Sequence, residues 1–123
     1  MAGHFSVRLE RSAPVVVISA TGEVDASTVG QLDGLFETAV TKYEGHVVLE
    51  LEGITFIDST GISSLVAGLR RLNRSRRRLA LACTSEGAVG RALQVTGLDH
   101  TFELHASTAD AVDELADAPL IGR

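Results

Sequence analysis

The residues best suited to chemistry in this 123-residue chain lie in the segment Asp58-Ser59-Thr60-Gly61. An apolar run with helical spacing follows it, so this segment is expected where a helix begins. Asp58 or Ser59 would accept a hydrogen bond from the backbone N–H of Gly61 or Ile62, a cap that stabilises a helix by about 1 kcal/mol. Unpaired N–H groups and the helix dipole also favour negative charge there. The fold would therefore tolerate a phosphate on Ser59.

A second polar segment, Gly22-Glu23-Val24-Asp25, follows a predicted strand. In parallel α/β folds, the loops at the carboxyl ends of strands collect the functional groups. We therefore expect this segment to lie close to Ser59. Asp25 has two interpretations: it caps the following helix, as Ser27 also could, or it has a functional role, in which it shapes a partner surface or orients the Ser59 hydroxyl during phosphorylation. Thr60 is expected to be structural and to hold the turn.

The common enzyme classes that use such a loop lack their other residues in this chain. A receiver domain needs an acidic pair after its first strand and a late lysine, whereas Lys42 is the only lysine. An aspartic protease needs Asp followed directly by Ser/Thr-Gly, and Thr60 interrupts that order. A Walker-A loop and a Gly-x-Ser-x-Gly elbow are absent. Catalytic residues and cofactors are therefore not predicted, although a phosphotransfer or hydrolytic enzyme using Asp58 remains the alternative from another class.

The histidines and the cysteine have simple structural interpretations. The histidines lack metal-ligand spacing, so no metal site is expected, and they are predicted to be surface or strand-end residues: His4, His46, His100 and His105. Cys83 is alone and ends an apolar run, which favours a small buried side chain in a reducing compartment. The N-terminus lacks the pattern of a signal peptide and no apolar run would span a bilayer, so we expect a cytoplasmic protein without membrane contact.

The charge is negative overall but unevenly distributed. The formal net charge is −5, which argues against direct nucleic-acid binding. Six of the 11 basic residues nevertheless lie between Arg70 and Arg78, and without them 5 basic residues face 16 acidic ones. Arg70, Arg71 and Arg74 can be a solvated face that complements the helix dipole. Contact with an acidic partner is the second interpretation of this cluster, and nucleic-acid binding is the third.

The periodicity of apolar residues predicts strands that alternate with helices. An alternating strand over 5–10 and a β-branched strand over 15–18 form a hairpin across the turn Ser12-Ala13-Pro14. The next elements, in chain order, are a helix over 29–40, a buried strand over 46–51 with Phe56-Ile57 along its far end, and a helix over 62–72. They are followed by a strand over 79–83, a short helix over 89–93 and a strand over 101–104. Gly97 is expected to end the short helix, and Ser107 to cap a last helix.

The order β-β-α-β-α-β-α-β-α indicates one α/β domain over residues 1–123, with a mixed, mostly parallel sheet of about five strands, an N-terminal hairpin and four helices. Its core is expected over about 5–116. The C-terminal tail, 117–123, is expected to be frayed from Pro119 onwards.

Three segments together resemble STAS-domain anti-sigma factor antagonists, also called anti-anti-sigma factors. They are Phe56-Ile57-Asp58-Ser59-Thr60-Gly61, Gly22-Glu23-Val24-Asp25, and Thr96-Gly97-Leu98-Asp99 followed by Phe102. The resemblance extends over nearly the whole chain. It implies that Ser59 is phosphorylated by an anti-sigma factor with serine kinase activity, and that a serine phosphatase reverses this. The unmodified form would bind the kinase and release a sigma factor.

The resemblance also implies which residues meet the partner. They are Gly22, Glu23, Asp25, Asp58, Ser59, Thr60, Gly61, Ile62 and Ser63. The alternative within the same fold is a STAS accessory subunit of another complex, such as a lipid-transport ATPase or a stress-signalling assembly. Such a subunit would bind through the same helix without phosphorylation. The oligomeric state stays open.

Overall fold

The chain begins with an antiparallel hairpin, as the alternating and β-branched runs predict. In a computed structural model that describes residues 5–12 and 14–119, β1 (Phe5–Ser12) pairs with β2 (Val15–Val24) from Phe5↔Gly22 to Ser12↔Val15. The later elements are α1 (Val29–Lys42), β3 (Val47–Glu50), β4 (Ile54–Ile57), α2 (Ser59–Arg74), β5 (Leu79–Ala82), α3 (Ala88–Thr96), β6 (Glu103–His105) and α4 (Thr108–Ala116). The predicted alternation of strands and helices is therefore confirmed.

The sheet is mixed and mostly parallel, with strand order β1-β2-β3-β5-β6. The described residues form six strands rather than about five, because the expected strand over 46–51 and Phe56-Ile57 belong to separate strands. β3 pairs with the first half of the long β2. The chain leaves β3 at Leu51, resumes as β4 at Ile54, and pairs with the far end of β2 in parallel. β4 thus brings the start of α2 beside the end of β2.

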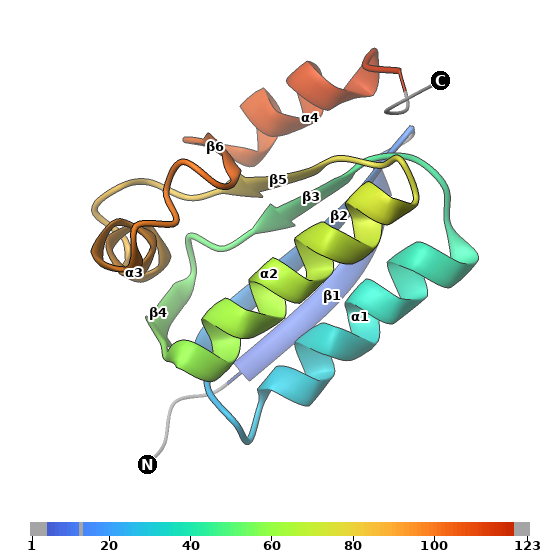
Figure 1. Cartoon of the computed structure of the whole chain (residues 1–123). Helices are drawn as coiled ribbons and strands as arrows, with labels where there is room; N and C mark the ends of the chain where they lie inside the picture. The colour runs from blue at the N-terminus through green and yellow to red at the C-terminus, as the bar shows by residue number, and fades with distance from the viewer. Residues whose placement is uncertain (1–4, 13, 120–123) are drawn as a thin grey trace.

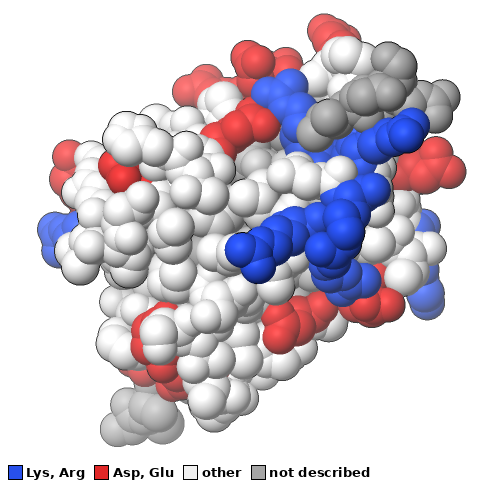
Figure 2. Space-filling view, viewed as in Figure 1, with Lys and Arg blue, Asp and Glu red and all other residues white. Residues whose placement is uncertain are grey.

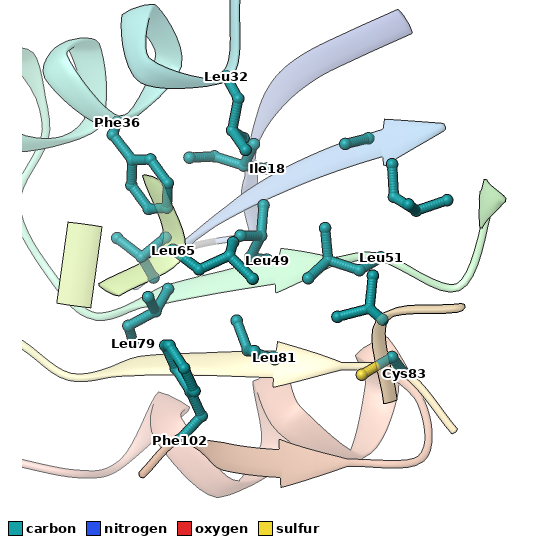
Figure 3. Packing of buried hydrophobic residues seen from close by; sticks show 14 of the residues in the cluster. Ile18, Leu32, Phe36, Leu49, Leu51, Leu65, Leu79, Leu81, Cys83 and Phe102 are labelled. Carbon is teal, nitrogen blue, oxygen red and sulfur yellow. The ribbon is translucent and has the colours of Figure 1, made fainter. Parts of the chain in front are cut away.

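Helices cover both faces of the sheet (Figure 1). α1 and α2 lie side by side on one face, α4 lies on the other, and α3 lies at the end of the sheet beside β4. The larger core lies between the sheet and the α1–α2 layer, where the labelled side chains of Figure 3 converge: Ile18, Leu32, Phe36, Leu49, Leu51, Leu65, Leu79, Leu81, Cys83 and Phe102. A smaller core lies under α4. Within the part of the chain that is described, no helix has the length and apolar character to cross a membrane.

The caps at the later helices confirm the sequence interpretation. Gly97 has a left-handed backbone (φ 75°) after α3, and the Ser107 hydroxyl accepts a hydrogen bond from the Asp110 N–H at 3.1 Å. The prediction that Cys83 is a buried thiol is confirmed as well, and burial raises the pKa of its thiol to about 11. The thiol therefore stays protonated near neutral pH.

The prediction that the histidines are surface or strand-end residues holds for His46 at a strand end, although its side chain is buried. His46 lies at the start of β3 and is only 3% exposed. Its Nδ1 accepts the Arg78 N–H at 2.8 Å, and its Nε2 lies 3.1 Å from the carbonyl oxygens of Ala118 and Pro119. The chain is thereby held beyond α4 as far as Pro119. The rest of the expected tail, 120–123, lies outside the described residues, as do His4 and Ala13 of the expected turn.

The α1–α2 layer depends on a glycine at the helix contact. A Cβ atom on Gly68 of α2 would lie 2.6 Å from ring atoms of Phe36 on α1. Phe36 is 2% exposed and packed in the core, so its ring has little room to move. Gly68 therefore lets the two helices approach, despite the poor helix propensity of glycine.

We expect Gly68→Ala to lower the free energy of unfolding by about 1–3 kcal/mol, because the added methyl group overpacks the core. Gly34→Ala on α1 is the matched control: apart from the chain neighbours and the backbone of its own helix, no atom lies within 4 Å of its added Cβ. That variant should raise the stability by about 0.5–1 kcal/mol. Urea unfolding measures both values. Equal effects of the two substitutions would contradict the contact, and Phe36→Leu should reduce the penalty of Gly68→Ala.

Candidate functional site

Asp58 is the residue that caps α2. Its extended backbone leaves β4, and its carboxylate accepts the N–H groups of Thr60 at 3.0 Å and Gly61 at 3.2 Å. Asp58 and Ser59 are the two predicted caps of α2; the prediction is confirmed for Asp58 and wrong for Ser59. Ser59 occupies the first helical position, one residue later, where its backbone is already in α2.

Ser59 lies at the surface, although the turn that carries it is well packed. Ser59 and Ser63 are exposed, whereas Gly61 and Ile62 are buried, as expected for positions on opposite faces of one helix. Thr60 is half-buried and lines a hollow between α1 and α2, and its expected role in holding the turn stays a prediction. Ser59 is thus exposed at the positive end of the α2 dipole, where the N–H groups of Thr60, Gly61 and Ile62 are already paired with Asp58.

Gly61 holds this first turn against the sheet. A Cβ atom on Gly61 would lie 2.6 Å from Cγ1 of Ile57 and 2.8 Å from Cγ1 of Val24. The backbone of α2 at Gly61 therefore packs directly against the side chains at the ends of β4 and β2. The sequence analysis assigned Gly61 to the partner surface, but the structure buries it as a packing residue. The available signal was a glycine, a poor helix former, in the first turn of a predicted helix.

The two polar segments meet at one edge of the sheet, as predicted. Val24 and Ile57 are paired residues of β2 and β4, and the Asp58 N–H donates to the Val24 carbonyl at 3.2 Å. Asp25 and Asp58 therefore follow neighbouring strand ends. Gly22 and Glu23 differ from the prediction, because they belong to β2 itself rather than to a loop, and both are half-buried.

Asp25 is bound within its own turn. Its Oδ1 accepts the Ser27 N–H at 2.9 Å and the Ser27 hydroxyl at 2.6 Å. These hydrogen bonds hold the pKa of the Asp25 carboxyl below its ordinary value. Both predicted caps of α1 are wrong: Thr28 precedes the helix, and its side chain makes no cap hydrogen bond. The Thr28 hydroxyl instead donates to the Glu23 carbonyl at 2.9 Å, which closes the turn.

A shallow apolar groove of about 410 Å³ lies beside Ser59, between the start of α2 and α3. Its lining residues are Ile57, Asp58, Ser59, Ile62, Ser63, Arg91, Ala92, Val95 and Thr96. Val95 is 87% exposed, the highest value among the large apolar side chains that the structure exposes. The contribution of α3 to the lining of this groove was not predicted from the sequence. The available signal was Val95, an apolar residue off the inward stripe of Val89, Ala92 and Leu93.

The site is suited to binding a protein surface. It presents the exposed Ser59 and Ser63, an apolar groove and the positive end of a helix, without a base positioned on the Ser59 hydroxyl among the described contacts. Within residues 5–12 and 14–119, no group of three or more His, Cys, Asp or Glu side chains is arranged to hold a metal ion. The described contacts also include no hydrogen bond between Asp25 and Ser59.

A family model of the STAS domain matches residues 6–111. The chain belongs to the STAS domain family. The anti-sigma F factor antagonist of Paenibacillus polymyxa is 23% identical over 113 residues, which are 91% of this chain and 96% of that protein. Like other matched relatives of this STAS protein, it is named for a regulatory antagonism rather than for a reaction, which agrees with the prediction of a non-enzymatic regulator.

Solved structures agree with this assignment. The anti-sigma factor antagonist from Mycobacterium paratuberculosis superposes with a TM-score of 0.80 at 26% identity, covering 93% of this chain and 96% of that one. The phosphorylated form of SpoIIAA, a Bacillus cell fate determinant, gives a TM-score of 0.69 at 25% identity, covering 89% of this chain and 98% of that one. The STAS fold predicted from the three sequence segments is therefore confirmed.

The different roles of Asp58 and Ser59 can be tested by the free energy of unfolding of variants at each position. We expect Asp58→Ala to lower the free energy of unfolding by about 1 kcal/mol, because two helix N–H groups lose their acceptor. Asp58→Asn, which retains an acceptor oxygen, should lose less. Ser59→Ala should change stability by no more than about 0.5 kcal/mol, as is usual for exposed positions. Urea unfolding that finds Ser59→Ala as damaging as Asp58→Ala would contradict this assignment.

Proposed function

We propose that this STAS protein is an anti-sigma factor antagonist whose partner binding is switched by phosphorylation of Ser59. The observation that carries the proposal is the exposed Ser59 hydroxyl at the first position of α2, beside a cap that Asp58 supplies alone. The fold does not depend on this hydroxyl, so its modification is available for signalling. The names of the matched relatives support the class of partner.

A phosphate on Ser59 would change the surface without opening the domain. It adds about −1.5 to −2 charges at neutral pH, next to the Asp58 carboxylate and beside the apolar groove. A partner that packs against the neutral surface would then have to desolvate that charge or face repulsion. A penalty of about 3–4 kcal/mol weakens binding by two to three powers of ten. The helix N-terminus meanwhile favours the same charge, so the fold is retained.

The proposed partner is an anti-sigma factor with serine kinase activity, and a serine phosphatase resets the switch. We propose that the partner covers the start of α2, the Gly22–Asp25 edge and the groove against α3. An apolar side chain of the partner would fill the groove between Ile62 and Val95, since the lining is mainly apolar. Binding frees a sigma factor, and the proposal places this exchange in the cytoplasm.

We expect Ser59→Ala to bind the anti-sigma factor as tightly as the wild type and to stay bound when ATP is added. Ser59→Glu should bind at least tenfold more weakly, because it places a charge at the same position, and should keep its native circular dichroism and melting temperature. Isothermal titration calorimetry with the kinase-type anti-sigma factors of the same genome measures these affinities.

The matched control is Ser12→Glu, which adds the same charge at another exposed position. Ser12 pairs with Val15, at the end of the hairpin away from Gly22 and the site. This control should bind like the wild type. Intact mass and site mapping after incubation with each kinase and ATP should show one phosphate, on Ser59. If binding occurs but no kinase modifies Ser59, the switch is wrong and an unphosphorylated STAS accessory subunit is favoured. Equal affinities of Ser59→Glu and wild type would show that charge is not the operative variable.

A further inference from the structure

The arginine-rich segment at the end of α2 divides into two sets of three. Arg71, Arg77 and Arg78 are engaged within the fold. Arg71 pairs with Glu37 at 2.7 Å, Arg78 pairs with Glu103 at 2.5 Å, and the buried Arg77 donates to the Gly45 carbonyl. The expectation that Arg70, Arg71 and Arg74 form one solvated face is therefore wrong for Arg71, whose guanidinium joins α2 to α1.

The second set, Arg70, Arg74 and Arg76, is exposed. Over residues 5–12 and 14–119, none of the three forms an ion pair with a carboxylate. Figure 2 shows the basic side chains gathered over the carboxyl end of α2, within a surface that carries acidic side chains elsewhere. We call these three side chains the arginine patch.

Arg76 occupies a backbone position at which glycine is the usual residue. α2 and α3 end in the same hydrogen-bonded turn: Arg76 N–H donates to Asn73 O and Arg77 N–H to Leu72 O, just as Gly97 N–H donates to Gln94 O and Leu98 N–H to Leu93 O. The left-handed residue is Gly97 (φ 75°) after α3 but Arg76 (φ 63°) after α2.

Arg76 is the one non-glycine residue with positive φ in the part of the chain that the structure describes. A side chain in this region costs free energy that glycine avoids, and such strain concentrates at functional positions. Backbone geometry alone therefore gives no reason for an arginine at this position. Its guanidinium makes no ion pair in the described fold, so an intramolecular salt bridge gives none either.

We propose that the arginine patch is a docking surface for an acidic segment of a partner protein. Arg70 and Arg74 lie one helical turn apart on the exposed face of α2, so they match two carboxylates with similar spacing. Arg76 adds a third guanidinium at the following turn. Planar guanidinium groups bind carboxylates through two parallel hydrogen bonds, which favours an Asp- or Glu-rich segment.

A protein segment fits this surface better than nucleic acid does. Three guanidinium groups give little counterion release, no aromatic side chain lies between them for base stacking, and the remaining surface is acidic. The rest of the surface is acidic and would repel an acidic segment. The arginine patch would therefore set the orientation in which the partner binds.

The patch and Ser59 form separate surfaces of one helix. At 1.5 Å per residue, Ser59 is about 16 Å from Arg70 and about 22 Å from Arg74 along α2. Both distances exceed the Debye length of about 8 Å in physiological salt, so the charge state of Ser59 has little effect at the patch. The inference therefore holds independently of the proposed switch.

The experiment titrates the 15N-labelled full chain with acetylated decaglutamate at about 20 mM salt and follows the backbone amide signals. We expect shifts that cluster between Leu69 and Arg78, and an affinity that falls at least threefold at about 200 mM salt. The triple variant Arg70→Gln/Arg74→Gln/Arg76→Gln should bind at least tenfold more weakly than wild type. Arg8→Gln, which removes an exposed arginine of β1 outside the patch and outside the groove, should bind like wild type.

Arg76 provides the sharper comparison. Arg76→Gly should weaken decaglutamate binding at least threefold while its melting temperature stays equal or rises, because glycine relieves the left-handed backbone. Arg76→Lys should bind within twofold of wild type. Unchanged binding by the triple variant, shifts centred elsewhere, tighter binding of a ten-nucleotide oligothymidylate than of decaglutamate, or a lower melting temperature of Arg76→Gly would each overturn the proposal.

Discussion

The close approach of α2 to the ends of β2 and β4 is the constraint on which the site depends. Gly61 allows it, since any side chain there would meet Ile57 and Val24 within 3 Å. β4 in turn exists because the chain leaves β3 early and pairs again with the far end of the long β2. With the first turn of α2 fixed in this way, Gly61 and Ile62 are buried and Ser59 lies on the exposed side of the turn.

This constraint separates two tasks that one residue could have combined. Asp58 satisfies the helix N–H groups, and Ser59 presents a hydroxyl that no described hydrogen bond requires. A modification of Ser59 can therefore alter the surface while the cap, the turn and the core remain. α3 completes the surface from the other side, because its exposed Val95 extends the apolar area next to the serine.

The order of elements and the location of the site could be predicted from sequence, because they follow from apolar periodicity and from the rule that functional loops gather at strand ends. The hairpin, α1, α2 and the caps at Gly97 and Ser107 are of this kind. Features that depend on tertiary contact could not be predicted. β4 separated from β3 because of its pairing with β2, and Asp25 turned towards Ser27 rather than capping α1. His46 is buried because the chain after α4 returns over it.

The account's central claim is that a phosphate on Ser59 alters the binding surface and leaves the fold unchanged. The most direct measurement is the free energy of urea unfolding of the chain phosphorylated stoichiometrically on Ser59, compared with the unmodified chain. We predict values within about 1 kcal/mol of each other with equal m-values, because the helix dipole offsets the repulsion from Asp58. A loss of more than about 2 kcal/mol, or a changed m-value, would show that phosphorylation acts through the stability of the domain and would contradict the claim.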